Sequence, residues 1–320
     1  MTIVKYERIH VAIDNSDHSN ASVHLGVDFG KTIGAALTGS HVYAAKLHDV
    51  RFKQMEFTLP DEYKEETELE KQRRIHDALI TRGLELISDS YLDQMERMSH
   101  ELGIDFTRKI FDGRTFEPLV DDLRDTGYDL LILGALGQGA VRDSEIGSVC
   151  ERVLRRTTLD TLVVRDEETM VLAGETPVAI ALDGSEYSWG ALQSGMALAK
   201  AASRPVHILA TVQENDESSA LVQAHLSLAE EIVAAEGLTV TGSLVESNKP
   251  SGVAIADFAA SLDAFAIAMG RHGLDAPTEN PEMGSVTEHV LRRGTTNVLV
   301  TSQTWNPAEA ALTLNSEIAA

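Results

Sequence analysis

Two stretches of this sequence occur twice, in the same order along the chain. HVAIDNSDHS at residues 10–19 resembles AIALDGSEYS at residues 179–188, and both end in an Asp-x-Ser-acidic-x-Ser pattern. GSVCERVLRRTTLDTLVV at residues 147–164 resembles GSVTEHVLRRGTTNVLVT at residues 284–301. Because both matches recur in one order, we infer a tandem duplication, so the chain folds as two copies of one unit.

The first copy is longer than the second. Asp14 to Gly134 spans 120 positions, whereas the matching interval from Asp183 to Gly270 spans 87, which leaves 33 additional residues in the first copy. We place them within residues 49–78, where DEYKEETELEKQRR is dense in charge. We expect a solvated helix face that lengthens the second helix of the unit, and a docking arm for a partner is the alternative.

Apolar runs of strand length alternate with helical stretches in both copies. In the first copy we expect strands at 9–13, 36–44, 105–111, 129–134 and 161–165, and helices at 21–33, 62–102 with one break, 117–126 and 148–156. In the second copy we expect strands at 178–182, 206–212, 239–245, 265–269 and 297–301, and helices at 188–202, 218–236, 251–261 and 285–293. Ser16 or Asp17 is expected to cap the first helix. Strict alternation predicts an α/β fold, with a parallel sheet covered by helices on both faces in each copy.

These elements divide the chain into two expected domains, residues 1–168 and residues 176–303. VRDEETMVLAGETP at 164–177 is the expected linker, and residues 304–320 form a tail to which we assign no role. The total of 320 residues suits two domains, because domains commonly hold about 150 residues.

Composition excludes several classes of function. The formal net charge of −23 argues against binding to nucleic acid or to an anionic membrane, since both would be repelled. No apolar run approaches the roughly 20 residues that span a membrane, and the start of the chain lacks the apolar core of a secretory signal. With one cysteine, Cys150, no disulfide can form within the chain. We therefore expect a soluble cytoplasmic protein, and the 11 histidines show no spacing typical of a metal site.

GALGQGAVRDSEIGS, at residues 134–148, is the motif that most resembles a binding loop. Gly134 ends a strand at the carboxyl edge of the sheet, where ligands of open parallel sheets bind. We expect Gly134 and Gly137 to adopt positive φ and to let the backbone approach a ligand. Gly147 and Ser148 open a helix, which Ser148 can cap, and its free N–H groups favour a phosphate. The nine residues between Gly137 and Gly147 are enough to wrap a di- or triphosphate, so the loop predicts a nucleotide site.

Other nucleotide motifs do not fit. A Walker A loop needs a Lys before its final Ser or Thr, and the dinucleotide fingerprint needs glycines after the first strand, where this chain has DNSDHS. Fast phosphoryl transfer needs a metal, a positioned nucleophile and cationic groups, but Arg142 is the only cation in the loop. We therefore predict no catalytic residues and at most slow ATP hydrolysis.

The pattern Gly-x2-Gly-x9-Gly-Ser, together with the strand that ends in Asp14, resembles the ATP-binding pattern of the universal stress protein family. The resemblance covers residues 6–166 and 176–302 and implies two tandem Rossmann-like domains, each with a five-stranded parallel sheet. Such domains pair through their last strands, which implies a pseudo-dimer within the chain, and we expect two chains to form a homodimer. The implied ligand is ATP, or AMP or ADP, with or without Mg²⁺.

The resemblance also implies a role for each matching residue. Asp14 faces the ribose, with Mg²⁺ contact or simple capping of the next turn as alternatives, and Val42 meets the adenine through its backbone. In the first copy, the ribose and phosphates are implied to contact Gly134, Gly137, Gly147, Ser148 and Val149. In the second copy, the matching residues are Asp183, Val212, Gly270, Gly273, Gly284, Ser285 and Val286.

The second site departs from the family pattern. Ten residues separate Gly273 from Gly284, among them Pro277 and Pro281, and DAPTENPE is acidic. Proline removes N–H donors, and acidic side chains repel phosphate, so whether this site is occupied stays open.

Two smaller features allow more than one interpretation. Cys150 lies near a helix start, which favours a redox role through a lowered pKa, but a buried apolar role is the simpler interpretation. Arg155-Arg156 and Arg292-Arg293 come late in a helix, where cations interact well with the helix dipole. We favour this structural role for the four arginines over phosphate binding.

We expect an adenine-nucleotide-binding stress-response protein that acts by a conformational or protective effect. Two alternatives remain, a slow ATPase or adenylate-chemistry enzyme on the same fold, and a nucleotide-free scaffold for dimerisation.

Overall fold

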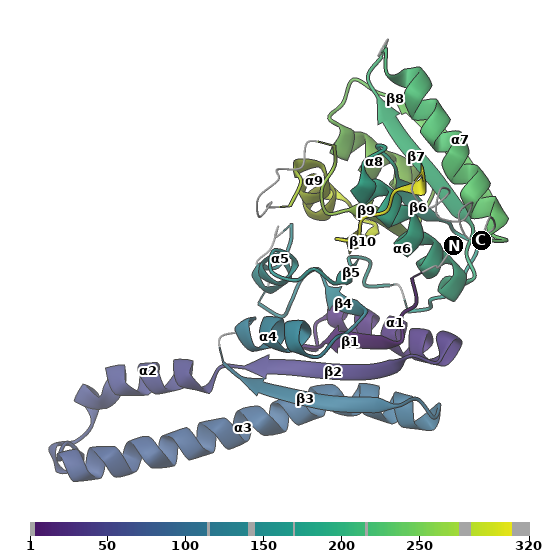
Figure 1. Cartoon of the computed structure of the whole chain (residues 1–320). Coiled ribbons are helices and arrows are strands. Elements are labelled where there is room, and N and C mark those ends of the chain that lie inside the picture. Colours follow the sequence, from purple (N-terminus) through teal and green to yellow (C-terminus); the bar gives the residue numbers. More distant parts are fainter. Residues whose placement is uncertain are drawn as a thin grey trace, which may run out of the picture.

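The computed structural model describes residues 4–113, 116–139, 145–168, 170–214, 217–274 and 283–308 (Figure 1). The first half contains β1 (Arg8–Ala12), α1 (Asp17–Ile33), β2 (Ala36–Tyr43), α2 (Ala45–Met55), the 3₁₀ turns η1 (Glu56–Thr58) and η2 (Asp61–Tyr63), α3 (Glu66–Glu101), β3 (Phe106–Asp112), α4 (Glu117–Asp125), β4 (Leu130–Gly134), α5 (Ser148–Leu154) and β5 (Asp160–Val164). The second half contains β6 (Val178–Ala181), α6 (Glu186–Ala202), β7 (Val206–Val212), α7 (Ser219–Ala235), β8 (Val240–Glu246), α8 (Ser251–Ser261), β9 (Ala266–Gly270), α9 (Ser285–Arg293) and β10 (Asn297–Thr301).

The strands form a single sheet of ten, in the order β3-β2-β1-β4-β5-β10-β9-β6-β7-β8. Within each half, all strand pairs are parallel. At the junction β5 and β10 are antiparallel, with Leu162 opposite Leu299. The predicted α/β fold is therefore confirmed, and the last strands of the two halves pair as expected.

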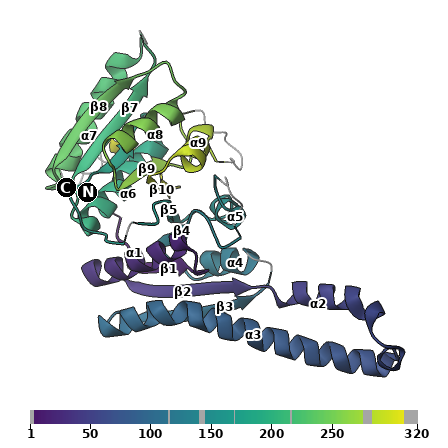
Figure 2. The same cartoon turned by 180° about the vertical axis from the view of Figure 1, so that it is seen from behind.

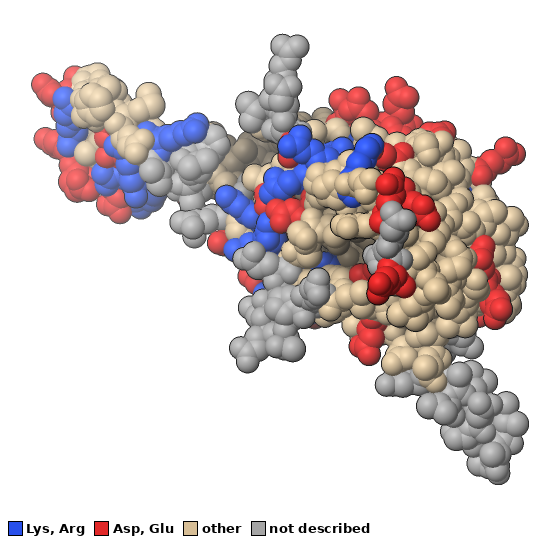
Figure 3. All heavy atoms as spheres, turned by 90° about the horizontal axis from the view of Figure 1, so that it is seen from above, with Lys and Arg blue, Asp and Glu red and all other residues tan. Residues whose placement is uncertain are grey.

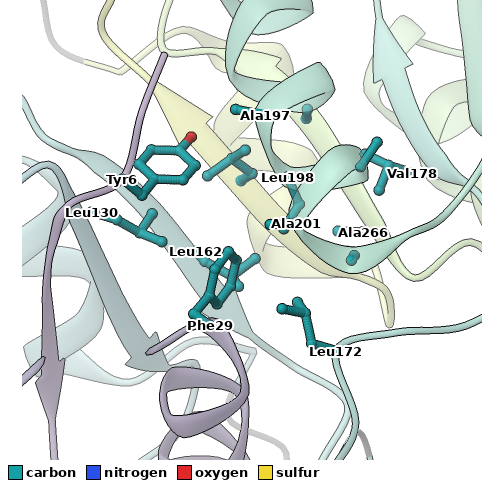
Figure 4. Packing of buried hydrophobic residues seen from close by; sticks show 14 of the residues in the cluster. Tyr6, Phe29, Leu130, Leu162, Leu172, Val178, Ala197, Leu198, Ala201 and Ala266 are labelled. Atoms are coloured by element: carbon teal, nitrogen blue, oxygen red, sulfur yellow. The ribbon is translucent and has the colours of Figure 1, made fainter. Parts of the chain in front are cut away.

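The junction is held by a core that both halves share (Figure 4). Phe29 of α1 and Ala201 of α6 approach the same cluster, together with Leu162 of β5. The linker takes part as well: Leu172 is buried, and its N–H donates to Asp28 Oδ2 at 3.0 Å. The two halves are therefore packed as one body rather than joined by a free tether.

The turn from β1 to α1 forms as the sequence predicts. Ser16 is the N-cap of α1, and its hydroxyl accepts the N–H of Ser19 at 3.3 Å. The helix ends at Gly34, whose φ of +74° lies in the left-handed region that glycine favours. Ser185 caps α6 in the same way, accepting from Ser188 at 3.1 Å.

The insertion forms a helical hairpin that projects from the body (Figures 1 and 2). The expectation of one break within residues 62–102 is wrong, because α3 runs unbroken over Glu66–Glu101. The chain turns earlier, near Pro60, and α3 contains no proline. The second helix of the unit is lengthened as expected, and α2 is added beside it. Neither α3 nor any other helix in the described ranges is long and apolar enough to cross a membrane.

Candidate functional site

A cavity of about 540 Å³, here called cavity A, lies at the carboxyl ends of β1, β2 and β4. It is bounded on one side by the glycine loop and the first turn of α5. Every residue predicted for the first site lines it: Asp14, Val42, Gly134, Gly137, Gly147, Ser148 and Val149. The fold thus brings together residues that lie up to 135 positions apart in the sequence.

Asp14 ties the β1–α1 turn to the glycine loop. Its Oδ1 accepts the N–H of Ser16 at 3.0 Å and lies 2.7 Å from the Ser16 hydroxyl. Its Oδ2 accepts the N–H of Gln138 at 3.1 Å. Capping of the turn is therefore part of the role of Asp14. An ionised carboxylate has about four acceptor positions, so capacity remains for one further donor.

The glycines of the loop serve close packing of the chain on itself. Gly134 and Gly137 do not adopt positive φ, so that expectation is wrong. A Cβ on Gly134 would lie 3.0 Å from the backbone nitrogen of Ser19, and one on Gly137 would overlap Asp14 Oδ2. The left-handed conformation occurs instead in the β1–α1 turn, where Asn15 has a φ of 60°. Glycine is needed because α1 and Asp14 press against the loop.

The start of α5 offers backbone donors to cavity A. Gly147 is the N-cap, and Ser148 is the first residue of the helix, so the prediction that Ser148 caps it is wrong. The Gly147 N–H donates to Ala135 O at 2.8 Å, which fixes the entry of the helix. The first N–H groups of a helix have no partner within it, so those of Ser148 and Val149 are available to an anion.

The remainder of the wall is mostly apolar. Leu119, Leu133, Ile146 and Cys150 contribute to it, and such a surface suits the flat faces of an adenine ring. Burial raises the pKa of the Cys150 thiol to about 12. The thiol therefore stays protonated at neutral pH, and the structure supports the apolar role of Cys150 over the redox role.

His41 is a lining residue that the sequence did not single out. Its Nδ1 lies 2.6 Å from Ile13 O, and because a carbonyl only accepts, Nδ1 carries the hydrogen. The ring packs edge-on against Tyr91 at 5.0 Å between centroids. Burial lowers the pKa of His41, so the imidazole is neutral at pH 7. No motif surrounds this histidine, so the only signal in the sequence was its place near the end of the second strand, directly after Ser40, which pairs with Ala12 of β1.

The second half contains a matching cavity of about 510 Å³, here called cavity B. Six of the seven predicted residues line it: Asp183, Gly270, Gly273, Gly284, Ser285 and Val286. Val212 is not among its lining residues. The strand register explains this: Ile13 donates to Ser40 O and Leu182 to Leu209 O. The counterpart of Val42 is therefore Thr211, which does line cavity B.

Cavity B keeps the turn of cavity A but differs in its loop. Asp183 Oδ1 accepts the Ser185 N–H at 2.9 Å and its hydroxyl at 2.6 Å. His272 occupies the position of Leu136; it is 5% exposed and packs edge-on against Tyr187. Burial lowers the pKa of His272, and the neighbouring Arg271 lowers it further.

Some sequence expectations fall outside the described residues. Arg142 in the first loop, and Pro277, Pro281 and the acidic stretch at 275–282 in the second, belong to this group. Across the described ranges, no three His, Cys, Asp or Glu side chains are grouped so that they could hold a metal ion.

The arginines after each glycine loop connect the two halves, which the sequence analysis did not foresee. Arg155 contacts Glu151 in its own helix and Glu288 in α9, each at 3.1 Å. Arg292 contacts Glu151 at 2.7 Å and Glu288 at 3.2 Å. The repeated Glu-x-x-x-Arg spacing in the two copies was the only signal in the sequence. These arginines act in ion pairs at the junction.

Both glycine loops are also anchored by the opposite half. Glu145, which precedes Gly147, forms an ion pair with Arg293 at 2.7 Å. Arg271, at the base of the second loop, donates to Leu154 O and Thr157 O, each at 2.5 Å. Each cavity thus depends in part on the half that does not contain it.

Comparison with known proteins identifies the domain. The sequence model of the universal stress protein family matches residues 5–165 and again 176–302. Stress response protein NhaX of Bacillus subtilis (strain 168) is 24% identical over 167 residues, which is 50% of this chain and 98% of NhaX. Universal stress protein Mb2019 of Mycobacterium bovis is 25% identical over 150 residues, 47% of this chain and 46% of that protein. The chain therefore spans about half the length of Mb2019.

Solved structures show the same architecture over nearly the whole chain. A universal stress protein from Archaeoglobus fulgidus DSM 4304 covers 93% of this chain and 98% of its own, with a TM-score of 0.64 and 18% identity. PA1789 from Pseudomonas aeruginosa PAO1, described as functionally unknown, covers 92% of both chains, with a TM-score of 0.60 and 14% identity. At these identities the likeness establishes the fold. With the family model matched twice, the chain belongs to the universal stress protein family and carries two copies of its domain in tandem.

Proposed function

We propose that this chain binds an adenine nucleotide in cavity A and acts in a stress response by a conformational or protective effect. The observation that supports this most is the convergence, in one cavity, of an apolar wall, the Asp14 carboxylate and the free N–H groups of α5. These features suit the base, the ribose and the phosphates of one ligand, in that order. ATP is the preferred ligand, with AMP and ADP as close alternatives.

The lining residues suggest how the nucleotide lies. The adenine would contact the backbone of Val42 and the apolar wall, with Asp14 accepting a hydrogen bond from a ribose hydroxyl. A ribose role suits Asp14 better than direct phosphate contact, because two anions repel. The phosphates would then reach Ser148 and Val149. Whether Mg²⁺ takes part in binding is tested by measuring nucleotide affinity with and without it.

Cavity B is a weaker candidate for the same ligand. Its Asp183 turn and the start of α9 repeat those of cavity A. However, the sequence after Gly273 contains Pro277 and Pro281, which lack N–H donors, and the acidic stretch DAPTENPE, which would repel phosphate. We propose that cavity B binds nucleotide less tightly than cavity A.

Rapid chemistry is not part of the proposal. Fast phosphoryl transfer requires cationic groups around the phosphates, and among the residues that line cavity A in the described part of the chain none is Lys or Arg. A slow ATPase and a nucleotide-free scaffold are the remaining candidates. We also propose a cytoplasmic location, because a single buried cysteine suits a reducing compartment.

The experiment is to identify by mass spectrometry any nucleotide retained on purification, and then to measure binding of ATP, ADP and AMP by calorimetry with and without Mg²⁺. Gly137→Ala is the test variant, because its Cβ would displace Asp14. Gly83→Ala on α3 is the matched control, because nothing lies within 4 Å of its Cβ and Gly83 is not among the residues that line cavity A. We expect Gly137→Ala to weaken binding at least tenfold and Gly83→Ala to change it little. Equal loss in both variants, or no binding by the parent chain, would refute the proposal. A kcat near the ~10 s⁻¹ typical of enzymes would favour the ATPase.

A further inference from the structure

The outer face of α3 carries an apolar strip. Ile75, Leu79 and Leu86 are 47, 69 and 53% exposed, although each has a large aliphatic side chain. Spacings of four and seven residues place them on one side of the helix. The strip lies on the arm, defined here as α2, the two 3₁₀ turns and residues 66–87 of α3 (Figure 1).

The described part of the chain covers only the other sides of α3. On the arm, α2 packs beside it, and Phe52 of α2 stacks on His76 with the ring centroids 4.1 Å apart. Nearer the body, Leu92 and Met95 are fully buried. The strip faces away from both contacts.

Charged residues continue the strip at both ends. Glu68 and Lys71 precede Ile75 at steps of three and four residues, and Asp93 and Arg97 follow Leu86 at steps of seven and four. Within the chain, Lys71 also contacts Glu68 at 3.6 Å, and Asp93 contacts Arg108 at 2.7 Å. Read from the tip, the end charges are negative and positive before the central part, and negative and positive after it; read in reverse, the sign of each end charge is inverted. The central part holds the apolar residues and Arg82. Arg97 is exposed and forms no ion pair with any residue in the described ranges. Such a strip is complementary to a second copy of itself laid antiparallel.

We propose that the outer face of α3 binds the same face of a second copy of this chain, with the two helices antiparallel about a twofold axis between residues 82 and 83. This axis places Leu79 opposite Leu86 of the second copy and Glu68 opposite Arg97 of the second copy. Lys71 then lies beside Asp93 of the second copy. Such an interface is isologous, since each patch meets its own copy.

The residues at the axis fit this arrangement. Arg82 is the strip residue nearest the axis, and its charge is met within its own helix by Glu85 at 3.2 Å. It would face Gly83 of the second copy, where a Cβ would have open space within 4 Å. Glycine inside a helix costs about 1 kcal/mol relative to alanine, and close approach of a second helix gives this glycine a purpose.

The charge distribution favours the arm over the body as the contact surface. The arm, residues 45–87, contains eight Lys and Arg against ten Asp and Glu, whereas the whole chain has 27 against 50. Two bodies therefore repel each other strongly and two arms hardly at all. Figure 3 shows basic and acidic atoms mixed on the arm at the upper left, and acidic atoms along the right-hand rim. This inference is independent of nucleotide binding.

Sedimentation equilibrium of the full chain tests the proposal. We expect the parent to dimerise and Leu79→Glu/Leu86→Glu to weaken the dimer at least tenfold, because four carboxylates would then enter the interface. Leu221→Glu on α7 is the matched control, since Leu221 is 61% exposed and lies outside the arm. These positions are exposed, so the variants should keep the circular dichroism spectrum of the parent.

A charge exchange tests the antiparallel register. Glu68→Arg alone and Arg97→Glu alone each place like charges opposite one another and should weaken the dimer severalfold. The double variant restores opposite charges at both contacts and should recover the parent affinity. A monomeric parent at every concentration tested would overturn the proposal, as would a dimer that Leu79→Glu/Leu86→Glu leaves intact. Failure of the double variant to recover would overturn the register.

Discussion

Arg292 of α9 lies across the junction from Glu151 of α5, with its Nη2 2.7 Å from Oε1. The reciprocal contact joins Arg155 to Glu288 at 3.1 Å. Both helices begin at a glycine loop, and in each the glutamate lies four residues and the arginine eight residues after the N-cap glycine. Two half-exposed pairs thus close a four-membered network between the helices that carry the two cavities.

The first prediction concerns this network. Glu151→Gln removes the charge that meets both Arg155 and Arg292. Exposed ion pairs contribute about 0–1 kcal/mol each, so we expect a loss of about 1 kcal/mol in the free energy of unfolding in urea. Glu231→Gln is the control, because Glu231 is exposed and has no ion partner among the described residues. The difference should shrink in high salt, and a loss that salt does not change would argue against an electrostatic cause.

The second prediction concerns Arg271, which is buried and donates to two carbonyls of the opposite half. Arg271→Met leaves Leu154 O and Thr157 O without these donors. Each buried unsatisfied group costs about 1–3 kcal/mol, so we expect a loss of about 2–4 kcal/mol in the free energy of unfolding. Arg124→Met, at an exposed position on α4, should cost little. Similar losses in the two variants would show that Arg271 does not hold the halves together.

The third prediction concerns the thiol of Cys150. Burial raises its pKa to about 12, so we expect almost no reaction with a disulfide reagent in the native state and full reaction in urea. A variant with Leu221→Cys on α7 should react at once at one site only, because position 221 is 61% exposed and lies outside the arm. Rapid labelling of Cys150 in the native protein would revive the redox interpretation.

Periodicity was sufficient to predict most of the fold, because alternation of apolar strands with helices leaves few topologies. Every predicted strand is present, and the Ser16 cap follows from local chemistry alone. The single break predicted within residues 62–102 was wrong, since no proline interrupts α3 and a single glycine, Gly83, does not end a helix of 36 residues.

The cavity could be predicted only where a motif marks it. Asp14 and the loop glycines recur at matching positions in both copies, so the repeat itself marked them as residues of a site. Val212 was wrongly matched to Val42, because both are valines at the end of the second strand of their copy. The register of β6 with β7, in which Ala181 pairs with Leu209, makes Thr211 the counterpart of Val42. The network of Glu151 and Arg292 depends on the antiparallel β5–β10 pair, a contact between distant segments that no local pattern reveals.

The last prediction concerns pH and His10, a fully buried residue of β1. Its Nε2 lies 2.7 Å from Ser40 Oγ, and its ring packs edge-on against Tyr128 at 4.7 Å between centroids. Burial lowers the pKa of His10 to about 3, the nearby Asp122 opposes this shift, and Lys109 adds to it. The unfolded chain takes up a proton below pH of about 6.5, whereas the folded chain does not until a much lower pH.

Between these values the unfolded state binds one more proton, so His10 makes stability rise with pH by about 1.4 kcal/mol per unit. Its contribution is complete above pH of about 6.5 and decreases as the pH falls toward 3. His10→Gln keeps a polar group beside Ser40 but does not titrate. We expect its free energy of unfolding to fall less steeply than that of the parent between about pH 6.5 and 5, measured by urea unfolding at each pH. If the free energy of unfolding changed with pH in the same way for both proteins, His10 would gain its proton over the same pH range in the folded and unfolded states. That result would contradict the effect of its burial.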